Sequence, residues 1–194
     1  DFNKLGTADP KVYETIAAGD TDLIFQLESS GFKKFMKELK PDCIEDIIAG
    51  VSLYRPGPMD YIPDYIKNKK NPENIKYAVP CLKPILEATY GVIVYQEQVM
   101  QIFREMAGYS LGQADIVRRA MGKKKLKVMQ QHREIFISGK DDSDGTPAID
   151  GAIKRGATRE IADDTFSKME SFASYAFNKS HAAAYAVVAC RTGW

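Results

Sequence analysis

The sequence predicts a mainly α-helical fold, a multi-helical domain with only minimal, short β segments. Three observations lead to this prediction. Apolar residues recur at helical spacing in every periodic segment but one. Residues that favour helix N-caps precede these segments, and Gly or Pro follows them. Only residues 92–95 (VIVY) have the composition of a strand. With 194 residues and 44% apolar content, the chain is long enough for one large domain or two small ones.

Capping residues mark the helices of the N-terminal part. Asp9 before Pro10 combines an N-cap with a first-turn proline, and Gly19 is a natural end. Residues 43–54 (CIEDIIAGVSLY) carry closely spaced Ile and Val, which predicts a buried helix. The expected elements are a helix at 10–18, a turn and short apolar run at 20–26 with Phe25 in the core, and a helix from Ser29 or Ser30 to the residues before Pro41. They are followed by the buried helix at 43–54 and an exposed loop with a short helix at 61–76.

The rest of the chain is also expected to be helical, apart from the short strand. Gly108 and Gly122 are placed to end helices, because a residue past a helix end often needs φ > 0. Residues 139–145 (GKDDSDG) are the segment most expected to be disordered. Helices are expected at 81–88, 96–107, 110–121, 128–137, 158–171 and after Asn178 or Ser180, with a strand at 92–95.

Composition excludes several function classes. The net charge is +1, so an electrostatic function must come from local clustering of charge. Cys43, Cys81 and Cys190 are far apart and the chain has two histidines, which argues against a disulfide scaffold or a zinc site and fits reduced thiols. With no signal peptide or membrane-length apolar run, we expect a cytoplasmic protein without a membrane partner. Its ends suggest a piece of a longer chain.

The strongest local charge lies in residues 110–127 (SLGQADIVRRAMGKKKLK). Ser110 and Gln113 form a capping-box start, and six of the last ten residues are Arg or Lys. Arg118 and Arg119 offer two-point forks for phosphate oxygens, and the lysines behind them add point charge. A solvated helix face is the alternative, since Asp115 is placed to pair with Arg119. Both interpretations stay open on the pattern alone.

A second polar stretch, residues 175–185 (YAFNKSHAAAY), precedes an alanine-rich helix. Asn178 and Ser180 are good caps, and the positive end of the helix favours an anion. Lys179 adds charge, while His181 adds a donor and Tyr175 a flat face. Simple capping with a solvated lysine is the alternative. Together with the basic stretch, however, two anion-suited helix ends favour a nucleotide-triphosphate pocket.

Arg55 opens a rigid Arg-Pro-Gly-Pro turn after the buried helix. From such a turn its guanidinium could point into a ligand site. The alternative is that Arg55 only satisfies carbonyl groups at the helix end.

Five blocks resemble the alpha subunit of bacterial DNA polymerase III, the C-family replicative polymerase. They appear in the family's order and span most of the chain: residues 24–29 (IFQLES), 53–59 (LYRPGPM), 91–101 (GVIVYQEQVMQ), 108–125 (GYSLGQADIVRRAMGKKK) and 177–186 (FNKSHAAAYA). The resemblance falls on the fingers region, which closes over the incoming nucleotide. It implies an N-terminal helical part at 1–75 and a fingers core at 76–194 with the basic helix and the FNKSH helix.

The resemblance also implies roles for particular residues. The residues expected to face the triphosphate are Arg118, Arg119, Lys123, Tyr175, Asn178, Lys179, His181 and Arg55. Lys124, Lys125 and Lys127 are expected to contact the DNA backbone. Departures from the family pattern are the opening Asp1-Phe2-Asn3-Lys4, where an Asp-Phe-Leu-Gly block is expected, and Ala176, where glycine is expected.

By the same resemblance, the complete polymerase joins deoxynucleoside triphosphates to primer–template DNA, with the sliding clamp and other replicase subunits as partners. Its Mg²⁺ ions are held by palm aspartates, not by this segment, so we assign no catalytic or metal-binding residue here and expect the fragment to be inactive. The alternative is a non-catalytic helical nucleic-acid-binding module that uses the basic stretch on a phosphate backbone. A third, weaker alternative is a purely structural helical fragment.

Overall fold

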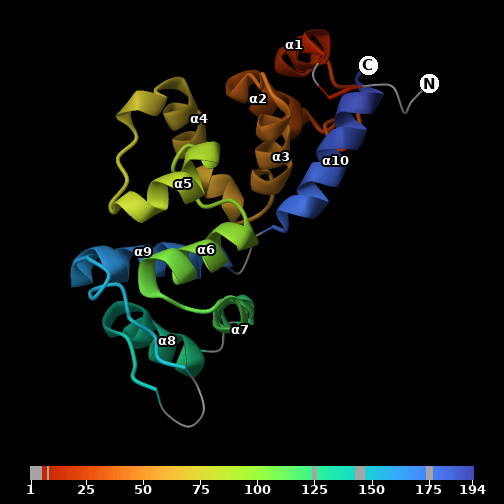
Figure 1. Ribbon diagram of the computed structural model, residues 1–194. Helices are drawn as coiled ribbons and strands as arrows, with labels where there is room; N and C mark the ends of the chain where they lie inside the picture. The colour runs from red at the N-terminus through yellow and green to blue at the C-terminus, as the bar shows by residue number, and fades with distance from the viewer. Residues whose placement is uncertain (1–5, 8, 124–125, 143–146, 174–176) are drawn as a thin grey trace. The chain divides into compact units, whose positions relative to one another are not determined.

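The computed structural model describes residues 6–7, 9–123, 126–142, 147–173 and 177–194. The regular elements of these residues are α-helices and short 3₁₀ turns (Figure 1). Within either of the two compact units of the described chain, the only β pairing is an isolated antiparallel bridge between Lys140 and Ile149. The mainly α-helical fold predicted from the sequence is therefore confirmed.

The chain divides into two compact units that are not simply consecutive. Unit 1 comprises residues 1–70 and 177–194, and unit 2 comprises residues 71–176. The sequence-based division at residue 75 followed chain order and assigned the FNKSH helix to the second part. In the structure, this helix instead packs in unit 1, with the N-terminal helices.

Unit 1 contains five α-helices among its described residues. They are α1 (Pro10–Ala18), α2 (Ser30–Leu39), α3 (Ile44–Leu53), α4 (Ile62–Lys70) and α10 (Lys179–Thr192), with a 3₁₀ turn at Pro58–Tyr61. The alanine-rich helix α10 packs on α3. Ala182, Ala186 and Ala189 are fully buried. Their small side chains allow the two helix backbones to come close, so α10 is held in place mainly by its packing against α3.

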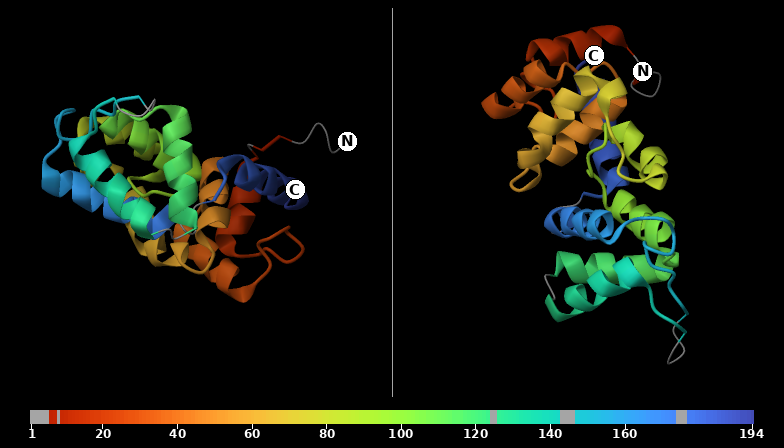
Figure 2. Two further views of the ribbon diagram at one scale, coloured as in Figure 1. Left: turned by 90° about the horizontal axis from the view of Figure 1, so that it is seen from below. Right: turned by 90° about the vertical axis from the view of Figure 1, so that its left-hand side faces the viewer.

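Unit 2 is built from four longer helices and several short turns. The longer helices are α6 (Gln96–Ala107), α7 (Leu111–Gly122), α8 (Leu126–Ser138) and α9 (Arg159–Ala173), preceded by α5 (Lys83–Leu86) and by 3₁₀ turns at Pro72–Asn74, Pro80–Leu82 and Glu87–Thr89. Figure 2 gives two further views of these helices. Phe103, Phe136 and Phe166 meet at the centre, with ring centroids 5.3–6.0 Å apart. Such contacts between rings stabilise the core beyond simple area burial.

Local signals placed most helix starts correctly. Asp9, Ser29 and Asn178 each accept a backbone N–H at an N-cap, and Ser110 forms the predicted capping box with Gln113. Each cap satisfies an otherwise unpaired amide of the first turn, which stabilises a helix by about 1 kcal/mol. Gly122 differs from the prediction, because it is the last helical residue and Lys123 follows it as C-cap.

The predicted strand at residues 92–95 is wrong. These residues form the approach to α6, where the amides of Val94 and Tyr95 donate to Gln98 Oε1 at 2.8 and 3.0 Å. Gln98 Nε2 in turn donates to Ile85 O and to Thr89 Oγ1. A single buried amide side chain thus supplies the partners that a neighbouring strand would have supplied.

The polar segment 61–76 contains α4, whose Tyr65 is fully buried, so the segment is less exposed than expected. Part of the loop expected to be disordered, residues 143–145, lies outside the described residues; within the rest, Lys140 forms its bridge with Ile149.

Candidate functional site

The end of α7 carries the arginine pair. Arg118 donates to Asp115 Oδ1 from Nη2 at 2.8 Å and from Nε at 3.2 Å, and its Nη1 donates to Gln96 Oε1 at 3.1 Å. Arg119 Nη2 lies 2.7 Å from Asp115 Oδ2. The side chain of Arg118 is 21% exposed and that of Arg119 is 68% exposed. Arg118 is therefore held in place, while Arg119 presents most of its guanidinium to solvent.

The electrostatics of this end follow from one carboxylate shared by two guanidinium groups. The hydrogen bond from Arg118, supported by that from Arg119, lowers the pKa of Asp115 below its usual value. One net positive charge remains among the three groups. The negative end of the helix dipole also favours cations here. The predicted pairing of Asp115 with Arg119 is confirmed, while the second pairing with Arg118 and the bond to Gln96 were not predicted.

The lysines that follow are only partly described. Lys123 is exposed, and its amide donates to Arg119 O at 3.2 Å. Lys127, in the first turn of α8, is also exposed. Lys124 and Lys125, which were assigned to the DNA backbone, lie outside the described residues.

The beginning of α10 is the second candidate. Asn178 Oδ1 accepts the amide of His181 at 3.0 Å, so Asn178 is the N-cap, and Ser180 lies in the first turn. Lys179, Ser180 and His181 are exposed at this positive end of the helix. Tyr175 lies outside the described residues. Since the arginine pair belongs to unit 2 and this helix end to unit 1, the shared triphosphate pocket stays a prediction.

A pocket of about 650 Å³ lies beside the start of α10, lined only by residues of unit 1. Arg55 belongs to it, with its Cζ atom 4.6 Å from the centroid of the Phe177 ring. The rigid turn holds Arg55 here, where Gly57 adopts φ 99° between the two prolines. Arg55 therefore lines a cavity that could hold a ligand, as one of the two interpretations requires. Its role in ligand binding stays a prediction.

Aromatic rings line much of this pocket, and of these only His181 was predicted from the sequence to have a function. Phe25, expected to be in the core, is 37% exposed, and its ring centroid lies 5.2 Å from that of Tyr185. The expectation for Phe25 was wrong because its turn places the ring against the exposed face of α10. The available signal was the spacing of Phe177, His181 and Tyr185, which recur every fourth residue.

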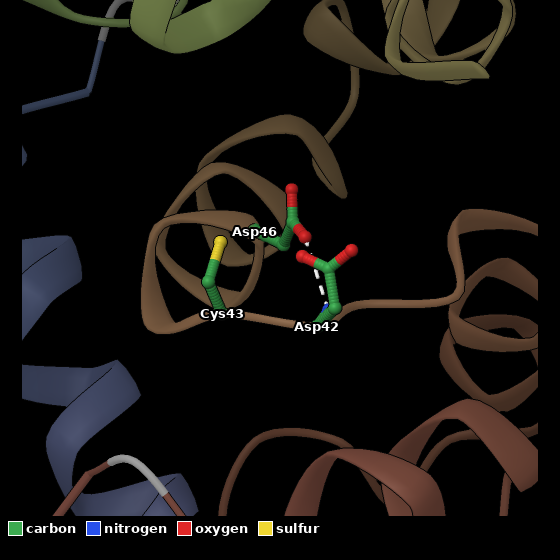
Figure 3. A group of neighbouring side chains, drawn as sticks. All are labelled: Asp42, Cys43 and Asp46. Carbon is green, nitrogen blue, oxygen red and sulfur yellow. Dashed lines mark hydrogen bonds between the residues drawn. The ribbon is translucent and has the colours of Figure 1, made fainter. Parts of the chain in front are cut away.

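One cluster in unit 1 resembles a metal site, and its chemistry does not fit Mg²⁺. Ligand atoms of Asp42, Cys43 and Asp46 lie within 4.8 Å of one another at the start of α3 (Figure 3). The ammonium group of Lys69 lies 2.7 Å from Asp46 Oδ2 and 3.1 Å from Asp42 Oδ2. Lys69 therefore supplies the positive charge that these carboxylates need. Mg²⁺ prefers oxygen ligands, and a thiol is a poor substitute.

The titration of the same cluster agrees with a structural role. Burial raises the pKa of the Cys43 thiol to about 11, so the reactive thiolate is disfavoured. Burial also acts against ionised Asp42, yet the hydrogen bond and charge of Lys69 lower the pKa of this carboxyl overall. We therefore interpret the cluster as an ion-pair network that joins α3 to α4.

Comparison with known proteins identifies close relatives of the whole chain. Residues 1–144 match the family described as "Bacterial DNA polymerase III alpha subunit finger domain". The chain is 48% identical to "DNA polymerase III subunit alpha" of Thermus aquaticus over 199 residues, covering 100% of the chain and 15% of that protein. It is 50% identical to the protein of the same name from Pasteurella multocida over 193 residues, covering 96% of the chain and 16% of that protein.

A third relative has the same extent. The chain is 48% identical to "DNA polymerase III subunit alpha" of Neisseria meningitidis serogroup B over 194 residues, 100% of the chain and 16% of that protein. The chain thus spans about 15–16% of the length of these three curated relatives. Within the part of the chain that the structure describes, no helix is both long and apolar enough to cross a membrane.

Proposed function

This chain belongs to the finger-domain family of bacterial DNA polymerase III alpha subunits, as its resemblance predicted, and from this premise we propose that it binds the triphosphate of an incoming deoxynucleotide. The observation that carries the proposal is the arginine pair at the end of α7. Arg118 is oriented by Asp115 and Gln96, while Arg119 is exposed beside it. An oriented guanidinium loses less conformational freedom on binding than a free one, so it grips phosphate oxygens more effectively.

The beginning of α10 supports the same ligand class in unit 1. Its exposed Lys179 and the positive end of the helix dipole favour a phosphate group. We propose that Asn178 acts there through its cap, which orders the first turn, and that His181 and Arg55 contribute from the adjoining pocket. Lys123 would add charge for the triphosphate, and Lys127, with Lys124 and Lys125, would contact primer–template DNA.

In the complete polymerase, the primer 3′-hydroxyl would attack the α-phosphate of the bound nucleotide and release pyrophosphate. Residues outside this chain would hold the Mg²⁺ ions, whose chemistry when bound would be Lewis-acid stabilisation of the phosphate charge. The finger residues would neutralise and position the triphosphate. We therefore expect no primer extension by the 194-residue chain alone. The sliding clamp, the other replicase subunits and a cytoplasmic location are proposals for the complete polymerase, drawn from the family.

The runner-up function is non-catalytic binding of a nucleic-acid backbone. Exposed Arg119, Lys123 and Lys127 also suit that role, because backbone contacts need charge more than geometry. A purely structural role for the helices would leave these charges solvated.

A competition experiment on the 194-residue chain distinguishes these functions. A fluorescent deoxynucleoside triphosphate would be bound at low salt and then displaced by inorganic triphosphate or by blunt duplex DNA. Our proposal predicts displacement by inorganic triphosphate at concentrations where the duplex, counted per phosphate, has little effect. Displacement by the duplex alone would favour the backbone-binding module. If neither the fluorescent nucleotide nor the duplex binds detectably, the helices have only a structural role.

A further inference from the structure

A continuous row of flat side chains runs along the exposed side of α10. The ring centroid of Tyr185 lies 5.2 Å from that of Phe25 and 4.5 Å from that of His181. The ring of His181 lies 5.3 Å from that of Phe177, which carries the guanidinium of Arg55 on its face at 4.6 Å. Each spacing lies in the range at which flat groups stack or tilt against one another.

These side chains are accessible, unlike the rings of a hydrophobic core. His181 and Arg55 are exposed, Phe25 is 37% exposed, and Tyr185 and Phe177 are half-buried. The same row lines the pocket of about 650 Å³ described above. A cavity of this size is within the range of small-molecule sites, roughly 300–1,000 Å³.

The charge of the pocket does not suit a whole triphosphate, although Arg55 and His181 can each contact one phosphate group of a nucleotide bound at the start of α10. The pocket lining includes one guanidinium, Arg55, and one carboxylate, Glu28, which is exposed. Leaving His181 aside, these formal charges cancel. A ligand with several negative charges would need more cations than the pocket supplies, whereas a neutral planar group would not.

The lining also offers hydrogen-bonding groups for the edge of such a planar group. Gln26 has an amide that both donates and accepts, and Glu28 accepts. The Ser29 hydroxyl accepts the Phe32 amide at 3.3 Å as the cap of α2, so its own hydrogen can still donate. Flat faces together with polar groups in one lining are what a nucleobase requires, because it stacks through its face and hydrogen-bonds through its edge.

We propose that this pocket binds one unpaired nucleobase of single-stranded DNA, by stacking against the ring row of Phe25, Tyr185, His181 and Phe177. The inference deepens the proposed function and rests on it for the identity of the polymer, a DNA strand. It assigns the pocket to a base of the strand, separately from the triphosphate contacts at the ends of α7 and α10. Stacking of this kind tolerates any base, so the pocket selects an unpaired nucleotide and not a sequence.

The test uses the 194-residue chain and short single-stranded oligodeoxynucleotides in about 0.3 M salt, where backbone attraction is weakened. Tyr185→Leu removes the central ring, while Tyr185→Phe keeps it. We expect Tyr185→Leu to weaken binding by about five- to 150-fold, the range measured for loss of one stacked base, and Tyr185→Phe to bind like the parent. Tyr77→Leu, which changes a half-buried ring of unit 2, is the matched control.

A second arm does not depend on the folding of any variant. The unchanged chain should bind an intact oligonucleotide more tightly than one of equal length in which every base is replaced by an abasic site. Equal binding of the two would overturn the proposal, as would unchanged affinity of a folded Tyr185→Leu variant. Binding of inorganic triphosphate is measured in parallel. If Arg119→Ala loses triphosphate binding and Tyr185→Leu keeps it, the triphosphate site and the base pocket are independent of each other.

Discussion

The end of α7 and the beginning of α10 both gather groups that suit a nucleotide, but they do so by different physics. At the end of α7 the positive charge is carried by side chains, and Asp115 holds Arg118 and Arg119 together. At the beginning of α10 the helix itself supplies the positive end, Asn178 caps it, and rings surround the adjoining pocket. The end of α7 therefore suits any negatively charged group. The beginning of α10 suits a negative charge at the helix end and a flat group in the pocket beside it.

This difference has a consequence for salt dependence. Ligands of the arginine pair should be released as salt is added, because exposed charges are screened within about 10 Å at 0.1 M. Ligands of the ring row should be retained, because stacking does not depend on net charge. The two regions can therefore be perturbed separately, and the variants below do so in order of decreasing effect.

The largest expected effect is a loss of stability in Asp46→Ala. Asp46 lies in α3, against which α10 packs, so the substitution should also weaken the α10 region. The Asp46 side chain is 1% exposed and bonded to Lys69, whose side chain is 11% exposed, so the substitution takes a carboxylate away from a largely buried ammonium group. We expect unfolding of the chain in urea, followed by circular dichroism, to show a loss of roughly 3 kcal/mol, at the low end for a broken buried pair. Asp22→Ala, which removes the exposed partner of Lys33, should change the stability by about 1 kcal/mol or less.

The effect of Asp46→Ala also tests whether the two regions are independent. At temperatures where the variant is partly unfolded, oligonucleotide binding through the ring row should fall with the folded fraction of unit 1. Binding of inorganic triphosphate by the arginine pair should fall less. Parallel loss of both would mean that the regions cannot be treated separately.

Asp115→Asn should sharpen the charge-based character of α7. The substitution keeps the size of the side chain and one oxygen that can still accept from Arg118 and orient it, while it removes the negative charge that neutralises part of the arginine pair. We expect inorganic triphosphate to bind about two- to tenfold more tightly at low salt, since two partly exposed ion pairs no longer compete. Weaker binding, measured by calorimetry, would instead mean that the orientation given by Asp115 matters more than the charge it cancels.

The smallest expected effect is a pH dependence confined to unit 2. Burial lowers the pKa of His132 below its ordinary value of 6.5, with Lys140 acting in the same direction. The unfolded chain then binds a proton more readily than the folded chain, so stability is complete above about pH 6.5 and is lost as the pH falls through the folded pKa. Thermal unfolding between pH 7.5 and 5 should show this loss, and His132→Gln should reduce it. An unchanged pH profile in His132→Gln would assign the dependence to other groups.

The sequence predicted those features that local residues determine. Asp9, Ser29, Ser110 and Asn178 cap helices through bonds to neighbours two or three residues away, so a short window was sufficient. Residues 92–95 could not be judged in this way. Their composition suits a strand, but their partner is the side chain of Gln98, which is buried against Ile85 and Thr89. The β-propensity of these residues was therefore overridden by hydrogen bonds to a side chain from a neighbouring helix.

The candidate site shows the same division between local and distant information. The basic stretch and the FNKSH stretch were visible from charge and capping residues. The ring row depends on Phe25 meeting Tyr185 across a long stretch of chain, and the position of Arg118 depends on Gln96. The four-residue spacing of Phe177, His181 and Tyr185 was visible, but only the structure shows that their face is open.

The proposal that the α7 arginines bind a nucleotide triphosphate can be tested directly in a full-length DNA polymerase III alpha subunit that carries this segment. Steady-state kinetics would be measured for Arg118→Ala, Arg119→Ala and Arg119→Lys, beside DNA binding over a salt series. Arg159→Ala is the matched control, because Arg159 is 58% exposed and, like Arg119, forms an ion pair with a carboxylate. We expect kcat/KM for the nucleotide to fall about ten- to a hundredfold in the alanine variants, incomplete rescue by lysine and little change in the control. Normal nucleotide kinetics with a reduced salt slope for DNA would contradict the account and assign the pair to the DNA backbone.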